Sequence, residues 1–241
     1  MCGRFVQIDQ NIERMKSLLN STWSLDSYPP HPRVVGNYNV PPGETVMVAA
    51  RPDSNLELFQ MTWGLIPEWN RDNHKLIFNA RSETITERPT FRTIASNRAI
   101  IPVEGFYEWA RSIQSTGKPV KWPFFFRRAD GETMLLAGLY KHQINRDTGE
   151  ITDNFVILTM GANSFMQSYH ARMPIIVEPD QVEGWLSTAP IASQIRYLTN
   201  ESTNRIHCYP VSNEVNFITN NSPLLMQPIE VPVEKYQNRL V

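Results

Sequence analysis

The chain begins MCGRF, which places a cysteine directly after the first methionine. A methionine that precedes a small residue is the usual substrate of methionine aminopeptidase, so we expect a mature chain that starts at Cys2 with a bare α-amine. An α-amine has a pKa of about 7.7 to 8.0, against about 10.4 for lysine, so far more of it is uncharged at neutral pH. Such an amine forms imines readily, which predicts a reactive group at Cys2.

The thiol of Cys2 gives that amine a second function. Once an aldehyde has condensed with the amine, the sulfur of the same residue can attack the imine carbon and close a five-membered thiazolidine ring. Closure within one residue benefits from a high effective molarity, so an N-terminal cysteine can trap aldehydes in a way that a lysine cannot. The alternative is that Cys2 is a small buried apolar residue without a chemical role.

Three short stretches elsewhere could supply groups that act with this aminothiol. GFYEW puts Glu108 at the end of an apolar run, where a partly desolvated carboxylate is suited to proton transfer. SYHARMP places His170 and Arg172 just before an apolar strand, and FNARSET places Asn79 and Arg81 on one side of an extended segment. The alternatives are a glutamate that faces water, a histidine that caps a helix, and a structural amide beside a surface ion pair.

The charge balance excludes general attraction to a polyanion. The 241 residues include 23 Lys and Arg against 24 Asp and Glu, so a nucleic acid must be held by a local cluster of cations. Cys2 and Cys208 make an improbable disulfide, and the cysteines and histidines lack the close paired spacing of zinc sites, so we expect no metal and no cofactor. No run approaches the roughly 18 apolar residues of a membrane span, and no signal-peptide core is present. We therefore expect an intracellular monomer that has no membrane partner.

Most of the chain after residue 43 is predicted to form short strands. Seven runs carry the β-branched and aromatic residues typical of strands: 44–50, 56–64, 98–109, 122–128, 133–140, 155–160 and 173–179. Before them, residues 10–19 have apolar side chains at helical spacing, and residues 24–43 are rich in proline and asparagine, which favours an extended loop.

Short helices are predicted between the strands, around residues 81–91, 162–170, 179–187 and 191–198. Strands do not alternate with long helices, which disfavours a doubly wound parallel sheet. We expect an α+β fold: a single domain with a mostly antiparallel, barrel-like sheet core flanked by short helices. The domain is predicted to cover residues 1–222, with residues 223–241 as a C-terminal extension.

Eight strings in this order resemble one family: MCGRF, YNVPPG, MTWGLIPEW, FNARSET, IIPVEGFYEW, AGLY, HARMP and VSNEVN. The chain resembles the SOS-response-associated peptidase (SRAP) family, whose members act on abasic sites in single-stranded DNA. The resemblance covers residues 2 to about 222. It implies that the protein becomes covalently attached to DNA through a thiazolidine formed by its N-terminal cysteine and the aldehyde of a ring-opened abasic sugar.

The resemblance also implies a role for each matched residue. Cys2 is the nucleophile, and Asn79 holds the cysteine or the sugar. Glu108 is the general acid/base of imine formation and reversal. His170 assists at the sugar hydroxyl and supports strand cleavage, a lyase activity, at the imine stage.

The same resemblance assigns DNA contacts. Arg81 and Arg172 grip the flanking phosphates, for which a guanidinium has well-matched geometry, and Arg4 is a lesser candidate for that task. Independently of the resemblance, aromatic rings beside the motifs could stack on bases, and Trp69, in the polar setting PEWNRDN, is the better candidate for a wedge between bases. Trp63 and Trp109 are more often explained as core aromatics.

Two other functions use the same residues differently. A cysteine hydrolase of the N-terminal-nucleophile class would use Cys2 with His170 and Glu108, and self-removal of the leader residue is a limited form of it. It requires an oxyanion hole, for which the Gly3 amide is the one evident donor near the nucleophile. A non-catalytic module that binds single-stranded DNA or protein would leave Cys2 without a role.

Overall fold

A computed structural model describes residues 2–8, 36–52, 56–67, 75–113, 119–144, 149, 151–200 and 206–230. The helix predicted over residues 10–19 and Trp69 lie outside these ranges. Five strands of the larger sheet close into a barrel in the order β10, β4, β3, β6 and β9, because β9 pairs with β10 again. Their bounds are Ile151–Gly161, Glu57–Trp63, Thr45–Ala50, Arg98–Val103 and Met134–Ile144.

Gly138 lets β9 lie closely between two neighbours of the barrel. It pairs with Ala99 of β6 on one side and with Ile157 of β10 on the other. A Cβ atom at this position would lie 2.5 Å from Ile101 Cδ1 and 2.9 Å from the Val156 carbonyl oxygen. The barrel therefore closes around a residue that has no side chain.

Three short strands extend the barrel sheet. β5 (Asn79–Arg81) pairs in parallel with β10, and β11 (Arg172–Pro174) pairs antiparallel with β10 further along the chain. β12 (Ile176–Val177) pairs with β9. The single strand predicted over 173–179 is thus wrong in one respect. It splits at Ile175, where the chain leaves β10 for β9 and Ile175 bonds to the Leu158 and Ala137 backbones.

A second, antiparallel sheet has the order β13, β8, β7, β1, β2. The bounds of these strands are Ile206–Pro210, Pro119–Arg128, Gly105–Ile113, Phe5–Gln7 and Asn37–Val40. The continuous strand predicted over 98–109 is also interrupted, because the chain bends at Glu104 and passes from the barrel strand β6 to β7 of this second sheet. A Cβ atom on the next residue, Gly105, would lie 2.3 Å from the Phe126 carbonyl oxygen, so only glycine fits there.

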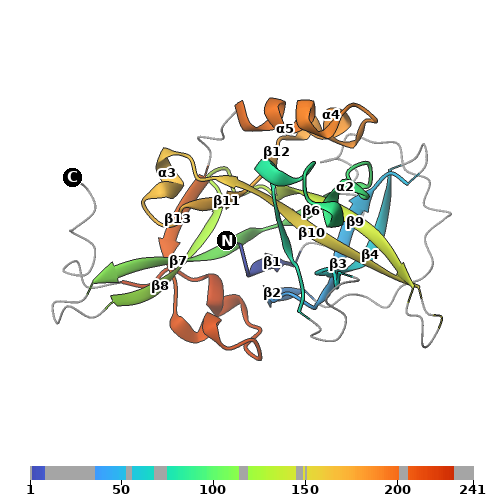
Figure 1. Cartoon of the computed structure of the whole chain (residues 1–241). Coiled ribbons are helices and arrows are strands. Elements are labelled where there is room, and N and C mark those ends of the chain that lie inside the picture. Colours follow the sequence, from blue (N-terminus) through green and yellow to red (C-terminus); the bar gives the residue numbers. More distant parts are fainter. Residues whose placement is uncertain are drawn as a thin grey trace.

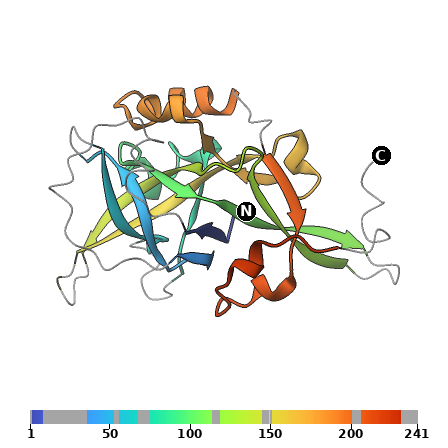
Figure 2. The ribbon, with the colours of Figure 1, turned by 180° about the vertical axis from the view of Figure 1, so that it is seen from behind.

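Short helices flank the sheets, and each of the four segments predicted as helical contains one. The α-helices are α2 (Pro89–Arg92), α3 (Ser164–Gln167), α4 (Val182–Leu186) and α5 (Ile191–Asn200). The 3-10 helices are η3 (Ser82–Thr84), η4 (Pro179–Gln181), η5 (Asn213–Asn216) and η6 (Pro223–Met226). Figure 1 shows α4 and α5 along one side of the barrel, and Figure 2 shows the red η5 and η6 segment below the second sheet.

Alternating strand residues divide the core between two faces. One set of barrel side chains, with Trp63 and Phe155, packs with Phe5, Phe106 and Phe126 of the second sheet. The other set packs under α2, α4 and α5. A third cluster places Leu225 of η6 on the opposite face of the second sheet, against residues that include Tyr107.

The prediction of a single α+β domain with a mostly antiparallel, barrel-like sheet core is confirmed. The boundary predicted at residue 222 stays a prediction, and the packing of Leu225 ties the start of the extension to the domain. Among the described residues, no helix has the length and apolar character needed to cross a membrane.

Candidate active site

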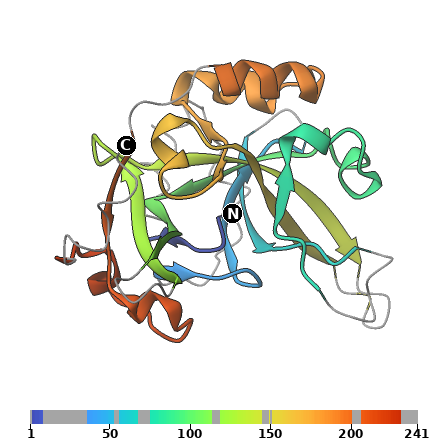
Figure 3. The ribbon, with the colours of Figure 1, turned by 60° about the vertical axis from the view of Figure 1, so that its left-hand side comes forward.

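Cys2 lies between the two sheets, because β1 is the strand that brings the start of the chain into the middle of the molecule. The dark blue β1 occupies this central place in Figures 1 and 3. Phe5 pairs with Phe106, and the Tyr107 N–H donates to the Arg4 carbonyl at 2.9 Å. Antiparallel pairing therefore runs the residues before Arg4 alongside those after Tyr107, next to the GFYEW motif.

Asn79 contacts Cys2 directly. Its Nδ2 donates to the Cys2 carbonyl oxygen at 2.7 Å. The Oδ1 of the same amide is buried and has no hydrogen-bond partner among the residues that the structure describes. A buried amide oxygen without a partner is uncommon and energetically unfavourable in a folded protein. It gives this site an acceptor that a bound amine or hydroxyl could use.

The thiol of Cys2 is kept in its neutral form. Burial, together with the nearby negative charge of Glu108, raises the pKa of the Cys2 thiol to about 12. At neutral pH the sulfur therefore carries its proton, and it is a weak nucleophile until that proton is removed. A thiolate attack as the first chemical step is disfavoured, whereas the same burial would favour the neutral, nucleophilic form of an amine.

Glu108 and His170 meet beside Cys2. The Glu108 side chain is only 6% exposed, and its Oε2 lies 3.8 Å from His170 Nδ1. Its Oε1 accepts the Trp109 N–H at 3.2 Å. The structure thus brings a buried carboxylate and an imidazole together near the sulfur, although they lie 62 residues apart in the chain.

Backbone groups orient the imidazole of His170. The Arg172 N–H lies 3.0 Å from His170 Nδ1 and donates to it when the proton of the neutral ring is on Nε2. The Arg172 carbonyl oxygen lies 3.0 Å from the same nitrogen and can accept from it when the ring is protonated. One peptide segment therefore accommodates both protonation states, which is useful for a group that takes up and releases a proton.

The two arginines assigned to phosphates are in different surroundings. Arg81 ends β5 and is exposed. Arg172 is paired with Glu83, at 2.5 Å and 2.9 Å between the guanidinium nitrogens and the carboxylate oxygens, and it also donates to the Thr159 carbonyl at 2.7 Å. A DNA phosphate would therefore meet Arg81 directly but would have to share Arg172 with Glu83.

Arg4 serves the structure of the domain. Its Nη1 donates to Asn39 Oδ1 at 2.7 Å and to the Val215 carbonyl at 2.9 Å. Asn39 in turn donates to the carbonyls of Val215, Phe217 and Asn220 at 3.3, 3.0 and 2.9 Å. We call Arg4 and Asn39, with these carbonyls, the asparagine node; it joins the YNVPPG and VSNEVN motifs.

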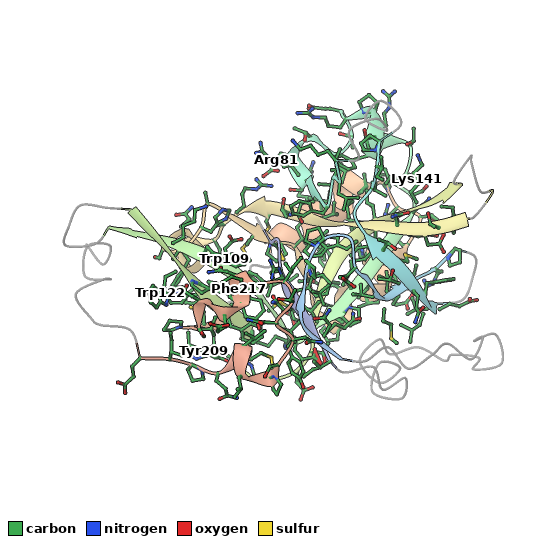
Figure 4. The ribbon with its side chains drawn as sticks, turned by 90° about the horizontal axis from the view of Figure 1, so that it is seen from below. Arg81, Trp109, Trp122, Lys141, Tyr209 and Phe217 are labelled. Atoms are coloured by element: carbon green, nitrogen blue, oxygen red, sulfur yellow. The ribbon has the colours of Figure 1, made fainter. Side chains whose placement is uncertain are left out.

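The tryptophans flanking the motifs have structural contacts. Trp63 is fully buried, and its indole N–H donates to the Phe78 carbonyl at 2.8 Å. Trp109 is half-buried and donates to Asn216 Oδ1 at 2.7 Å. Figure 4 shows Trp109 beside Phe217, which is 61% exposed, with Arg81 well apart from both. The interpretation of Trp63 as a core residue fits this burial.

A pocket of about 360 Å³ adjoins the site next to Asn79 and Arg81. Its walls are mostly apolar, with two arginines and two threonines among the lining residues, which are Ile77, Asn79, Arg81, Thr84, Arg88, Pro89, Thr90 and Phe91. An apolar surface rimmed by cations suits one unit of a nucleic acid strand. The described parts of the chain hold no group of three or more metal-ligating side chains, and both cysteines are free thiols.

The motifs identify Cys2 and the three residues around it, Asn79, Glu108 and His170, but not the residues that support them. Glu83, Thr159 and Asn39 were not identified as site or node residues. Glu83 and Asn39 stand inside the strings FNARSET and YNVPPG, so a signal was present for both. Thr159 lies within an ordinary apolar strand, where nothing in the sequence distinguishes it.

Comparison with known proteins identifies relatives over nearly the whole chain. An abasic site processing protein of Bacillus subtilis, YoqW, is 33% identical over 238 residues, which cover 94% of this chain and 99% of the relative. YedK of Escherichia coli, also named an abasic site processing protein, is 32% identical over 95% of this chain and 100% of its own. The chicken protein HMCES carries the same description and is 27% identical over 74% of this chain and 59% of its own.

Solved structures with a similar fold also match most of this chain. A crystal structure of a Bacteroides thetaiotaomicron protein has a TM-score of 0.73 and 25% identity, and covers 94% of this chain and all of its own. A Bordetella bronchiseptica protein has a TM-score of 0.69 and 27% identity, and covers 88% of this chain. The family model for SOS response associated peptidase (SRAP) matches residues 1–218. The resemblance of the eight motifs is therefore confirmed, and the chain belongs to the SRAP family.

Proposed function

We propose that this protein processes abasic sites in single-stranded DNA by forming a covalent thiazolidine cross-link through Cys2 after Met1 is removed. The observation that carries the proposal is the juxtaposition of Cys2 with a hydrogen-bonded Asn79 and with the pair Glu108 and His170. The names of the relatives YoqW and YedK support abasic DNA as the substrate. No cofactor is needed for this chemistry.

The first step joins the α-amine of Cys2 to the aldehyde carbon of the ring-opened sugar. The amine adds to the carbonyl, and the resulting carbinolamine loses water to give an imine. Glu108 takes a proton from the amine nitrogen and gives it to the oxygen that leaves as water, and the same transfers run backwards when the reaction reverses. His170 assists the sugar hydroxyl in this proposal, and its ring can gain and lose a proton without moving.

The second step closes the ring without any further reactant. The sulfur adds to the imine carbon while its proton passes to the nitrogen, so the S–H bond and the π bond of the imine are replaced by one C–S and one N–H bond. Burial raises the pKa of the Cys2 thiol, which supports this order, because the amine then reacts while the thiol stays protonated. Glu108 is placed to relay the proton from sulfur.

Strand cleavage is a side branch of the imine. Before sulfur attacks, loss of a proton from the carbon next to the imine expels the 3′ phosphate by β-elimination. His170 supports this lyase step. The same site can release the leader residue by self-processing, which would make the amine available.

DNA is held by local contacts, since the net charge of the chain is only −1. Arg81 and the pocket beside Asn79 provide a path for the strand next to the lesion, and Arg172 adds a second cation. Trp69 is the proposed wedge between bases. Arg4 contributes through the asparagine node, which holds β1 in place, more than through a phosphate contact.

A gel assay and an intact-mass measurement test the proposal together. Purified protein is incubated with single-stranded DNA that carries one abasic site, and a heat-stable shifted band is expected on a denaturing gel. The mass of the protein should show loss of Met1 and addition of the DNA. Cys2→Ala should abolish the heat-stable band, whereas the matched control Cys208→Ala should keep it.

Other outcomes would favour the alternatives. Reversible binding that is unchanged in Cys2→Ala would indicate a non-catalytic DNA-binding module. Hydrolysis of peptides unrelated to the leader would indicate a general cysteine hydrolase, which the neutral state of the buried thiol argues against.

A further inference from the structure

The ion pair between Glu83 and Arg172 has unusual connections for a pair near the surface. The Arg172 side chain is 18% exposed and that of Glu83 is 50% exposed. Both nitrogens of the guanidinium fork meet the two carboxylate oxygens, at 2.5 Å and 2.9 Å. This bidentate geometry fixes the plane of the guanidinium as well as its position.

Thr159 contacts the same guanidinium through its carbonyl and hydroxyl oxygens. Arg172 Nη2 donates to the Thr159 carbonyl at 2.7 Å and lies 3.2 Å from its hydroxyl oxygen. Thr159 is fully buried in β10, where it pairs with Arg81 of β5 and with Pro174 of β11. The Glu83 carboxylate therefore holds Arg172 at the place where the Asn79 strand and the His170 segment both join β10.

The backbone of Arg172 transmits this hold to the imidazole. Its N–H donates to His170 Nδ1, and its carbonyl oxygen lies at the same distance of 3.0 Å. Arg172 alone links Glu83 to His170. Its guanidinium is held by Glu83 and Thr159, and its own backbone N–H and carbonyl contact the imidazole. Movement of Arg172 would move the ring relative to Glu108, which lies 3.8 Å away.

We propose that Glu83 is a positioning residue that, by fixing Arg172, holds the imidazole of His170 in its Nε2–H form beside Glu108. The inference rests on the proposed function for the role it gives to His170. Its physical basis is that an ion pair can contribute little to the stability of the fold and still determine the position of a reacting group. A partly exposed ion pair adds little to fold stability, but a displacement of about 1 Å at a reacting group can slow a reaction roughly 100-fold.

The chain offers a matched control for Glu83. Glu183 forms a similar bidentate pair with Arg51, at 3.0 Å and 2.9 Å, with 61% of the Glu183 side chain and 22% of the Arg51 side chain exposed. Arg51 follows β3 and Glu183 belongs to α4, and neither contacts a site residue in any described hydrogen bond. Glu183→Gln thus removes the same kind of interaction from a different place.

Kinetics with abasic single-stranded DNA separate positioning from binding. Single-turnover rates of strand cleavage are measured at saturating DNA, and Kd is measured with DNA that carries a stable tetrahydrofuran analogue of the lesion. Glu83→Gln should slow cleavage about 10-fold or more and leave Kd within about twofold or tighter, since a negative charge near the strand is lost. Glu183→Gln should change neither value, and Glu83→Asp should recover part of the rate.

A double variant tests whether Glu83 acts through His170. If it does, Glu83→Gln combined with His170→Gln should be no slower than His170→Gln alone, because the group being positioned is already absent. Multiplied rate losses in the double variant would overturn the inference. Equal cleavage rates of Glu83→Gln and Glu183→Gln, measured where the parent protein is active, would also overturn the inference.

Nitrogen NMR of the histidine rings provides a test that does not depend on activity. The parent protein should show His170 as the Nε2–H tautomer, and Glu83→Gln should show a mixture of tautomers. If Glu83→Gln does not fold, the spectra of Glu83→Asp and of the parent protein still test the inference. A proton on Nδ1 of the neutral ring in the parent protein would overturn it. A parent that neither cross-links nor cleaves abasic DNA would refute the proposed function, whereas the spectrum would still report on the geometry.

Discussion

Two asparagines in two short motifs are used in opposite ways. The side chain of Asn39 is 1% exposed overall and satisfies both ends of its amide, with Arg4 at the oxygen and three backbone carbonyls at the nitrogen. Asn79 makes one bond, to the Cys2 carbonyl, and keeps a buried oxygen without a partner. A saturated amide stabilises the fold, whereas an amide with one unused acceptor is prepared for a ligand.

Asn39→Ala is expected to have the largest effect, and the effect should be on stability. The substitution takes the Asn39 donor away from the Phe217 and Asn220 carbonyls and removes one of the two acceptors of Arg4 Nη1, which should lower the free energy of unfolding by about 3 kcal/mol. Thermal unfolding should show a fall in Tm of roughly 6 to 12 °C. A change below about 2 °C would mean that the asparagine node does not hold the two motifs together.

Asn79→Ala should show the reverse pattern. It removes one hydrogen bond and one unsatisfied oxygen, so Tm should change by only a few degrees. The rate of cross-link formation at saturating DNA should fall on the order of 100-fold, because the group that holds Cys2 is lost. A variant with normal rate and a large fall in Tm would place Asn79 in the same class as Asn39 and remove the contrast.

The pH dependence of stability gives the smallest of these effects. Burial raises the pKa of Cys2 from 9.0 to about 12, so the folded protein keeps a proton that the unfolded chain releases above pH 9. The stabilisation is complete below pH 9 and is lost as the pH rises from about 9 to about 12, with a slope of at most about 1.4 kcal/mol per pH unit.

Denaturant titrations between pH 8 and pH 10.5 measure that slope. Cys2→Ala should lose stability less steeply than the parent protein over this range. Cys208→Ala should show nearly the same change over this range, because burial raises the pKa of Cys208 to about 11, so this thiol also stays largely protonated in the folded protein up to pH 10.5. Identical slopes in the parent and in Cys2→Ala would show that the Cys2 thiol is not buried in solution.

The sequence was sufficient for the elements that local pattern controls. Apolar runs predicted the barrel strands, because runs such as those of β3 and β6 are short and buried on both faces. The breaks at Glu104 and Ile175 were not predictable in this way, since both residues stand inside uniformly apolar or strand-like runs and change sheet partners only in the folded chain.

The candidate site shows the same division. Cys2, Asn79, Glu108 and His170 were named from motifs, and the structure brings them together, while their chemical roles stay proposals. The bonds of Arg4 were not foreseeable, because its partner Val215 lies 211 residues away. A cation in a motif can serve a phosphate or a fold, and only its neighbours in space distinguish the two.

The pairing of both β5 and β11 with β10 affects how the site residues move relative to one another. Asn79 and Arg172 belong to strands that both pair with β10, whereas Cys2 and Glu108 belong to the second sheet or the segment that leads into it. Fluctuations of the barrel should therefore carry the amide and the imidazole together and preserve their spacing. Sliding of one sheet against the other would instead change the distance between these two groups of residues, so the rigidity of the contact between the sheets sets how tightly the site encloses any bound group.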